Sequence, residues 1–156
     1  MPSGKRTDYV FVTIQLILFA IYFLVPLKLQ ADAKIVYAYA GIVILFTGLF
    51  LIMTAIIQLN KNISAFPTPV KNAQLITNGV FKFIRHPIYA GIILSAVGYG
   101  LFFSDIFKLM MSFVLLVFFD MKSNYEEQKL SEKFPDYTFY QTRTGKFTPP
   151  FFKSKK

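Results

Sequence analysis

The segment Ile35–Leu59 reads IVYAYAGIVILFTGLFLIMTAIIQL and has no charged side chain anywhere along it. A helix needs roughly 20 apolar residues to cross the hydrocarbon core of a bilayer, so this segment is long enough to do so. A second uncharged run, Tyr9–Leu27, precedes it. Only helices and closed barrels satisfy their backbone hydrogen bonds in lipid, so the two runs predict an integral membrane protein with helical spans.

Two more apolar runs lie in the second half of the chain. Ile88–Ser104 carries no charge, and Ile106–Phe119 carries a single charge, on Lys108. The first of these runs is long enough for a short span. The second is shorter, and it crosses a membrane only if Ser104 and Asp105 form a tight turn and the helix continues past Asp120.

We therefore expect an all-α fold, in which one polytopic membrane domain covers residues 1–156 with about four transmembrane helices. The expected spans are residues 9–27, 35–59, 88–104 and 106–121, with a cytosolic loop at 60–87 and a cytosolic tail at 122–156. The sequence DMKSNYEEQKLSEKF at 120–134 predicts a helical extension of the fourth span, which Pro135 ends.

Four glycines stand in the second and third expected spans. Gly41 and Gly48 are seven residues apart, as are Gly91 and Gly98, so each pair shares a helix face. Small residues on one face let two helix backbones approach closely, and we expect that use for both pairs. An alternative use of these glycine-bearing helices is the contact between two copies of the chain in a homodimer.

The basic residues indicate the orientation in the membrane, because the net charge of +9 is unevenly distributed. With four spans, the side that holds both termini and the 60–87 loop carries Lys5, Arg6, Lys61, Lys71, Lys82, Arg85 and the C-terminal lysines. The other side carries Lys28, Lys34 and Lys108. Both termini are therefore expected in the cytoplasm, at the inner membrane of a bacterium or the endoplasmic reticulum of a eukaryote. Topology and anionic lipids account for the charge, and nucleic acid is not expected as a partner.

The first apolar run also resembles a secretory signal, because Lys5-Arg6 precedes it and the small residues Ala31-Asp32-Ala33 follow it. Signal cores are about 7–15 residues long, however, and this run is longer. Lys28 also interrupts the approach to the alanines. We therefore expect the run to be kept as a span.

The sequence has no cysteine and one histidine, His86. It therefore has no thiolate nucleophile, and no metal site is expected. The histidine stands in Arg85-His86-Pro87, where a polar loop meets an apolar run. Pro87 suits the first turn of a helix, whose free N–H groups attract anions, and Arg85 would reinforce that attraction. Taken alone, the same residues more simply indicate a headgroup contact from Arg85 and a helix cap from His86.

A second polar cluster, Glu126-Glu127, follows the expected hairpin. Alone, this pair is typical of an exposed helix with weak ion pairs four residues apart. The span pair Ile88–Met121, however, returns the chain to the membrane face that it left. We therefore expect Glu126 to approach Arg85 and His86. Such a site at a bilayer surface would suit a small zwitterionic cofactor and a lipid-borne acceptor.

Several motif pieces surround the hairpin in a fixed order. They are Gly79–Gly91 (GVFKFIRHPIYAG), Glu126–Leu130 (EEQKL), Phe134, Tyr137, Tyr140, Arg143 and Phe147–Pro149 (FTP). With them, residues 75–151 resemble the isoprenylcysteine carboxyl methyltransferase family, membrane enzymes that use S-adenosylmethionine. That family has tyrosine where Phe81 stands, and arginine is common where Lys146 stands.

The resemblance implies an S-adenosylmethionine-dependent methyltransferase whose acceptor is lipophilic or membrane-associated. The catalytic residues that it implies are Arg85 and Glu126. The cofactor-binding residues that it implies are Gly79, His86, Tyr89, Glu127, Tyr140 and Arg143, with one of the two glutamates making the contact. The loop at 60–84 and the aromatic tail would exclude water from the site.

The nature of the acceptor stays open at this point. A carboxylate would be oriented by Arg85 and needs little help from a base, whereas an amine or phenol would lose a proton to Glu126 or His86. The alternatives are a phospholipid or other amine N-methyltransferase of the same superfamily, and a non-catalytic membrane partner that retains the fold. The expected partners are a lipophilic methyl acceptor and membrane lipids.

Overall fold

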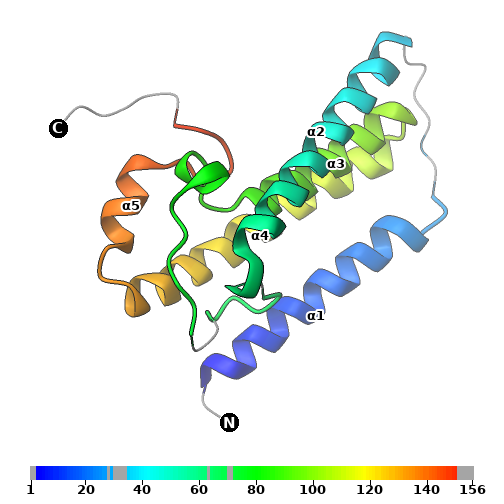
Figure 1. The fold of residues 1–156 in the computed structure, drawn as a ribbon. Coiled ribbons are helices and arrows are strands. Elements are labelled where there is room, and N and C mark those ends of the chain that lie inside the picture. Colours follow the sequence, from blue (N-terminus) through cyan, green and yellow to red (C-terminus); the bar gives the residue numbers. More distant parts are fainter. Residues whose placement is uncertain (1–2, 28, 30–34, 63, 70–71, 151–156) are drawn as a thin grey trace.

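The computed structural model describes residues 3–27, 29, 35–62, 64–69 and 72–150 of the chain (Figure 1). Its helices are α1 (Ser3–Leu24), α2 (Ile35–Leu59), α3 (Pro87–Phe102), α4 (Ile106–Lys133) and α5 (Tyr137–Arg143), with 3-10 turns η1 (Asn60–Asn62) and η2 (Gly79–Lys82). Within the described ranges there is no named strand, and an isolated parallel bridge joins Ile84 to Gly145. The all-α prediction is confirmed.

Two helices in the described part of the chain are long and apolar enough to cross a membrane. They are residues 6–24 of α1, 19 residues in length, and α2, with 25 residues. α3 is apolar but has 16 residues, or about 24 Å at 1.5 Å per residue. The helical extension of α4 is polar. The first two predicted spans are therefore matched by suitable helices, and the third and fourth spans stay predictions.

The hairpin between α3 and α4 has the tight turn and the long second helix that were expected from the sequence. The backbone N–H of Asp105 donates to Gly100 O over 2.9 Å, and Ser104 has a φ of +51° in the turn. The Asp105 carboxylate then caps α4 by accepting from the N–H of Lys108 over 3.3 Å. α4 runs unbroken past Asp120 to Lys133. Both conditions set for the hairpin, the tight turn and the continued helix, are confirmed.

α2 and α3 lie side by side (Figure 1) and contact each other through the four glycines. A Cβ atom on Gly41 would lie 2.7 Å from Gly98 O, and one on Gly48 would lie 2.6 Å from Gly91 O. The reverse substitutions meet the same backbones, so the fit is mutual. The predicted close packing is confirmed. Because it joins two helices of one chain, a homodimer through these glycines would have to break this contact.

α1 joins the rest of the fold through the core between α1, α3 and α4. Tyr22 is 2% exposed, and its hydroxyl donates to Ala96 O over 2.8 Å. Lys108, near the start of α4, donates its ammonium to Tyr22 O. Leu115 and Phe119 of α4 complete this core. The signal-like residues Ala31-Asp32-Ala33 and the topology markers Lys28, Lys34 and Lys71 lie outside the described residues, and the membrane orientation stays a prediction.

Candidate functional site

The connection from α2 to α3 is fixed at Gly79. Its φ of +57° favours glycine, and a Cβ atom there would collide with the side-chain amide of Gln58. That amide accepts from the N–H of Val80 over 3.0 Å and so holds η2 against the end of α2. Gly79 therefore shapes the backbone before α3, and it is not among the residues that line the cavity described below.

The segment that enters α3 pairs with the segment that follows α5. Arg85 N donates to Gly145 O over 2.9 Å, and Gly145 N donates to Phe83 O over 3.0 Å. His86 N donates to Lys146 O over 3.1 Å. Because of these bonds, the tail passes directly beside Arg85 and His86. No sequence pattern marked this pairing, since a bridge of so few residues has no hydrophobic period.

Glu127 joins the start of α3 to α4. Its Oε1 accepts from Arg85 Nε over 2.8 Å and lies 3.1 Å from His86 Nε2, while its Oε2 accepts from Gln141 Nε2 over 2.7 Å. Arg85 also donates from Nη1 to the carbonyl oxygens of Gln141 and Thr144. Burial alone would raise the pKa of Glu127, but the hydrogen bonds from His86 and Arg85 outweigh it and lower the pKa to about 2. Glu127 is thus an ionised clamp, and it is not on the cavity lining.

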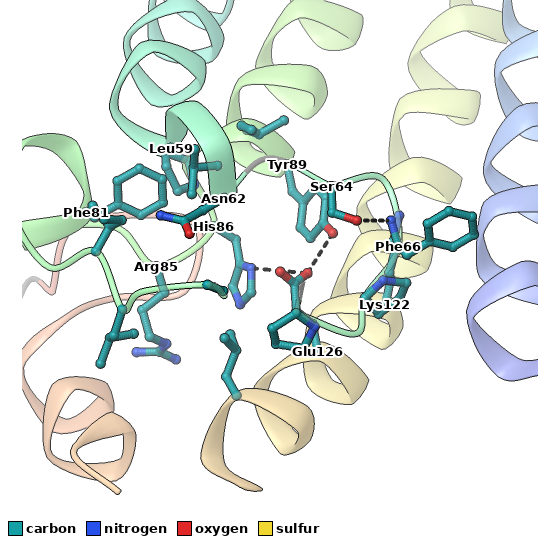
Figure 2. A pocket seen from close by; sticks show the side chains of 18 of the residues that line it. Leu59, Asn62, Ser64, Phe66, Phe81, Arg85, His86, Tyr89, Lys122 and Glu126 are labelled. Carbon is teal, nitrogen blue, oxygen red and sulfur yellow. Dashed lines mark hydrogen bonds and ion pairs between the residues drawn. The ribbon is translucent and has the colours of Figure 1, made fainter. Parts of the chain in front are cut away.

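Glu126, the other member of the pair, faces the cavity. Its Oε2 accepts from the Tyr89 hydroxyl over 2.7 Å and lies 3.9 Å from His86 Nδ1 (Figure 2). The rings of His86 and Tyr89 are stacked, with centroids 5.4 Å apart and an interplanar angle of 6°. The predicted approach of Glu126 to His86 across the hairpin is confirmed, whereas the carboxylate that pairs with Arg85 is that of Glu127. The imidazole therefore lies between two carboxylates, one structural and one that faces the cavity.

The cavity has a volume of about 310 Å³, near the lower end of the range for small-molecule sites. The loop after α2 contributes a large part of its wall, as expected for the 60–84 loop, and the tail contributes aromatic side chains. The apolar part of the lining includes Ile56, Leu59, Phe66, Ile88, Ile92, Leu130 and Phe134, and the polar part includes Arg85, His86, Tyr89, Lys122, Glu126, Tyr137 and Tyr140.

Two tyrosines of the tail lie on the cavity wall but differ in their partners. Tyr140 donates its hydroxyl to Phe81 O over 2.6 Å, and burial raises its pKa to about 12. Tyr137 is 1% exposed, and its hydroxyl has no hydrogen-bond partner among the residues that the structure describes. A buried hydroxyl without a partner costs free energy, so Tyr137 is a donor available to a ligand.

Arg143, which was predicted to contact the cofactor, is not among the residues that line the cavity. Its guanidinium is exposed and sits 3.9 Å from the centroid of the Phe139 ring. On α5 the buried positions are Tyr137, Tyr140 and the following Thr144, a helical stripe that leaves Arg143 on another face. Its predicted contact with a cofactor stays a prediction.

Two polar residues that sequence reasoning missed also line the cavity. Lys122 of α4 is 1% exposed, and Gln15 of α1 meets its ammonium. Lys122 stands among the polar residues that follow the fourth apolar run, where a lysine is usually solvated. Its spacing of four residues from Glu126, one helical turn, was the signal that could have identified it.

No cluster of three or more metal-ligating side chains occurs among the described residues. The polar groups around the mostly apolar cavity include a carboxylate, an imidazole, three tyrosine hydroxyls and two cations.

Two matches with known proteins bear on this site. The sequence model of the phospholipid methyltransferase family matches residues 36–137, which include α2, α3 and the Glu126-Glu127 pair. Over 104 residues the chain is 29% identical to the protein-S-isoprenylcysteine O-methyltransferase of Schizosaccharomyces pombe, a match that covers 65% of this chain and 44% of the relative. The chain thus spans less than half the length of that relative. Together with the apolar helices, these matches support the resemblance stated from the motifs, and the chain belongs to the phospholipid methyltransferase family.

Proposed function

We propose that the protein is an integral-membrane methyltransferase that transfers a methyl group from S-adenosylmethionine to a lipophilic or membrane-associated acceptor. The observation that carries this proposal is the cluster of His86, Tyr89 and Glu126 on a cavity whose lining is mostly apolar. The family match supports methyl transfer, and the apolar ends of α2 and α3 on the cavity wall support an acceptor that arrives from the bilayer. In this proposal α3 and α4 form the third and fourth spans, and the cavity lies at the cytoplasmic membrane surface.

The polar side chains of the cavity fit S-adenosylmethionine. The unpartnered hydroxyl of Tyr137 and the carboxylate of Glu126 suit the hydroxyl and ammonium groups of a nucleoside linked to an amino acid. His86, Tyr89 and Tyr140 would complete the binding surface with stacked or edge-on rings. When bound, S-adenosylmethionine supplies an electrophilic methyl group on a positively charged sulfur.

The two glutamates have separate roles in this proposal. Glu127 stays ionised and holds Arg85 and His86 in place, because its oxygens are already hydrogen-bonded. Glu126 faces the cavity and contacts the ligand. With an amine acceptor, Glu126 would take the proton that is lost, and His86 at 3.9 Å is the next group that could carry it. With a carboxylate acceptor, orientation is the main contribution of the residues.

The identity of the methyl donor and the position of its site can both be tested by binding measurements. S-adenosylhomocysteine should bind the detergent-purified protein, and His86→Ala and Glu126→Gln should each weaken binding at least about tenfold by removing a hydrogen bond to a charged group. Glu132→Gln, a change on the exposed part of α4, is the matched control. Lack of binding by the folded parent, or equal binding by all variants, would contradict the proposal.

The acceptor can be tested by transfer of a labelled methyl group. Lipid extracts and a prenylated cysteine should be offered in parallel, because the family match and the relative's name suggest different acceptors. Label in a phospholipid would support the amine acceptor, and base-labile label on the prenylated cysteine would support the carboxylate. A parent that binds S-adenosylhomocysteine and methylates neither would favour the non-catalytic alternative.

A further inference from the structure

Lys122 is a buried cation at one end of the cavity. Its ammonium donates to Gln15 Oε1 over 2.5 Å and to Ala65 O over 3.0 Å, and it lies 5.4 Å from the centroid of the Tyr89 ring. Figure 2 shows Lys122 and Arg85 on opposite sides of the cluster formed by His86, Tyr89 and Glu126. The cavity therefore has a cation at each end and the reactive carboxylate between them.

The partners of Lys122 are neutral. Within the described part of the chain, no carboxylate lies within ion-pair distance of its ammonium, although Asp8 and Glu126 are near enough to influence its pKa. Burial lowers the pKa of Lys122, and the two carboxylates only oppose that effect. Buried charges in proteins are normally paired, because leaving water is costly for an isolated ion. An ammonium has three N–H groups, and two of them have hydrogen-bond acceptors here.

Arg85, the cation at the other end, is already occupied. Its Nε donates to Glu127, and its Nη1 donates to the carbonyl oxygens of Gln141 and Thr144. Its positive charge is therefore balanced by the Glu127 carboxylate, which leaves Lys122 as the cavity cation without a directly paired charge.

We propose that Lys122 binds the anionic group, a phosphate or a carboxylate, of the lipid-borne acceptor. This inference rests on the proposed methyltransferase function and adds the chemical class of the acceptor. The anion would occupy the third N–H of the ammonium and supply the missing counter-charge. The apolar lining by Phe66 and Ile92 at the cavity would accommodate the beginning of the lipid chain.

Tyr89 lies between the proposed anion site at Lys122 and the carboxylate of Glu126. Its ring face lies beneath the Lys122 ammonium, and its hydroxyl donates to Glu126 over 2.7 Å. An acceptor held at Lys122 would thus lie beside the tyrosine whose hydroxyl contacts Glu126. A headgroup with an anion and a second polar group a few bonds apart would fit both residues.

The rival account is structural: Lys122 would only fasten the loop at Ala65 and helix α1 at Gln15 to α4. Under that account, loss of the ammonium would loosen the cavity wall and would weaken every ligand of the cavity similarly. Under the anion-site proposal, only ligands with an anionic group are affected.

Binding of single-chain probes to the detergent-purified protein separates these accounts. The probes are decyl phosphate, decanol and inorganic phosphate, with methylthioadenosine, a nucleoside thioether that has no anionic group, as a reporter of the rest of the site. The parent should bind decyl phosphate at least about tenfold more tightly than decanol, as expected for a charge-assisted hydrogen bond. Inorganic phosphate alone should bind more weakly than decyl phosphate, because it lacks the apolar chain.

Variants of Lys122 complete the experiment. Lys122→Met should remove the preference for decyl phosphate over decanol and leave the affinity for methylthioadenosine unchanged, and Lys122→Arg should retain most of the preference. Lys129→Met changes a lysine of the same helix that pairs with Glu132 and does not line the cavity, and this variant should bind like the parent. Unchanged decyl phosphate binding by Lys122→Met would overturn the proposal, and so would parallel loss of all ligands. Failure of the parent to bind S-adenosylhomocysteine would instead contradict the proposed function, and the anion preference would still be measured.

Discussion

Arg85 Nε lies 2.8 Å from Glu127 Oε1, and this ion pair joins the residue before the third helix to the fourth helix across the hairpin. Both side chains are largely buried, with 12% of each exposed. The two residues were expected to act in the chemistry and the cofactor contact. Their hydrogen bonds fit a supporting frame that holds His86 beside Glu126, and their predicted roles in the chemistry and the cofactor contact stay predictions.

Glu127→Gln should destabilise the protein, because it leaves the Arg85 charge buried without its partner. Breaking a buried pair costs about 3–5 kcal/mol, so the thermal midpoint in detergent should fall clearly. The measurement is thermal unfolding followed by circular dichroism. Glu132→Gln removes an exposed ion pair with Lys129 and should shift the midpoint little. Equal thermal midpoints for Glu127→Gln and the parent would contradict the stabilising role of the ion pair between Arg85 and Glu127.

The contribution of Glu127 to stability should also depend on pH. Its pKa falls from an ordinary 4.5 to about 2 in the folded protein, so the folded state binds fewer protons than the unfolded state between these values. The contribution is complete above pH 4.5 and is lost as the pH falls towards about 2. The difference in thermal midpoint between the parent and Glu127→Gln should therefore narrow on acidification. A difference in thermal midpoint that widens on acidification would contradict the lowered pKa of Glu127.

Tyr89→Phe should reduce methyl transfer without unfolding the protein. It removes the hydroxyl that donates to Glu126 and keeps the ring that stacks on His86. A hydrogen bond to a charged group is worth about 1.5–3 kcal/mol, so kcat/KM should fall by about 10- to 100-fold. Tyr99→Phe, further along the same helix, should retain the parent rate. A Tyr89→Phe enzyme as fast as the parent would remove this hydroxyl from the site.

Gly98→Leu should disrupt the contact between the second and third helices. A side chain at this position would run into the backbone of Leu45 and Gly41, which cannot yield as a flexible side chain can. Overpacking costs about 1–3 kcal/mol or more, and the thermal midpoint should fall accordingly. Val43→Leu, at a position that is 64% exposed, is the control on the second helix. A stable Gly98→Leu protein with an unchanged midpoint would show that the helices pack differently.

The sequence predicted what depends on chain direction and helical period. The uncharged runs indicated the helices, Pro87 marked the start of α3, and the return of the hairpin brought Glu126 towards His86. The role of the glycines in close helix packing was predicted correctly, because a spacing of seven residues keeps both glycines of a helix on one face.

What the sequence did not provide is the direction of particular side chains. Arg143 matched a family motif, yet the helical stripe of α5 leaves it exposed. Lys122 resembled a solvated lysine, and its burial depends on α1 and the loop near Ala65, which pack against it from distant parts of the chain. The different roles of Glu126 and Glu127 likewise follow from tertiary contacts, because adjacent helical residues point in different directions.

The bridge between Ile84 and Gly145 has a consequence for biogenesis. During synthesis all four long helices emerge before the residues that pair with Phe83, Arg85 and His86. The helices can thus enter the bilayer first, and the nascent protein then has no finished cavity wall. The protein would become able to bind a ligand only in the last step, when the tail docks. A chain whose helices are inserted but whose tail is not yet docked would therefore be inactive.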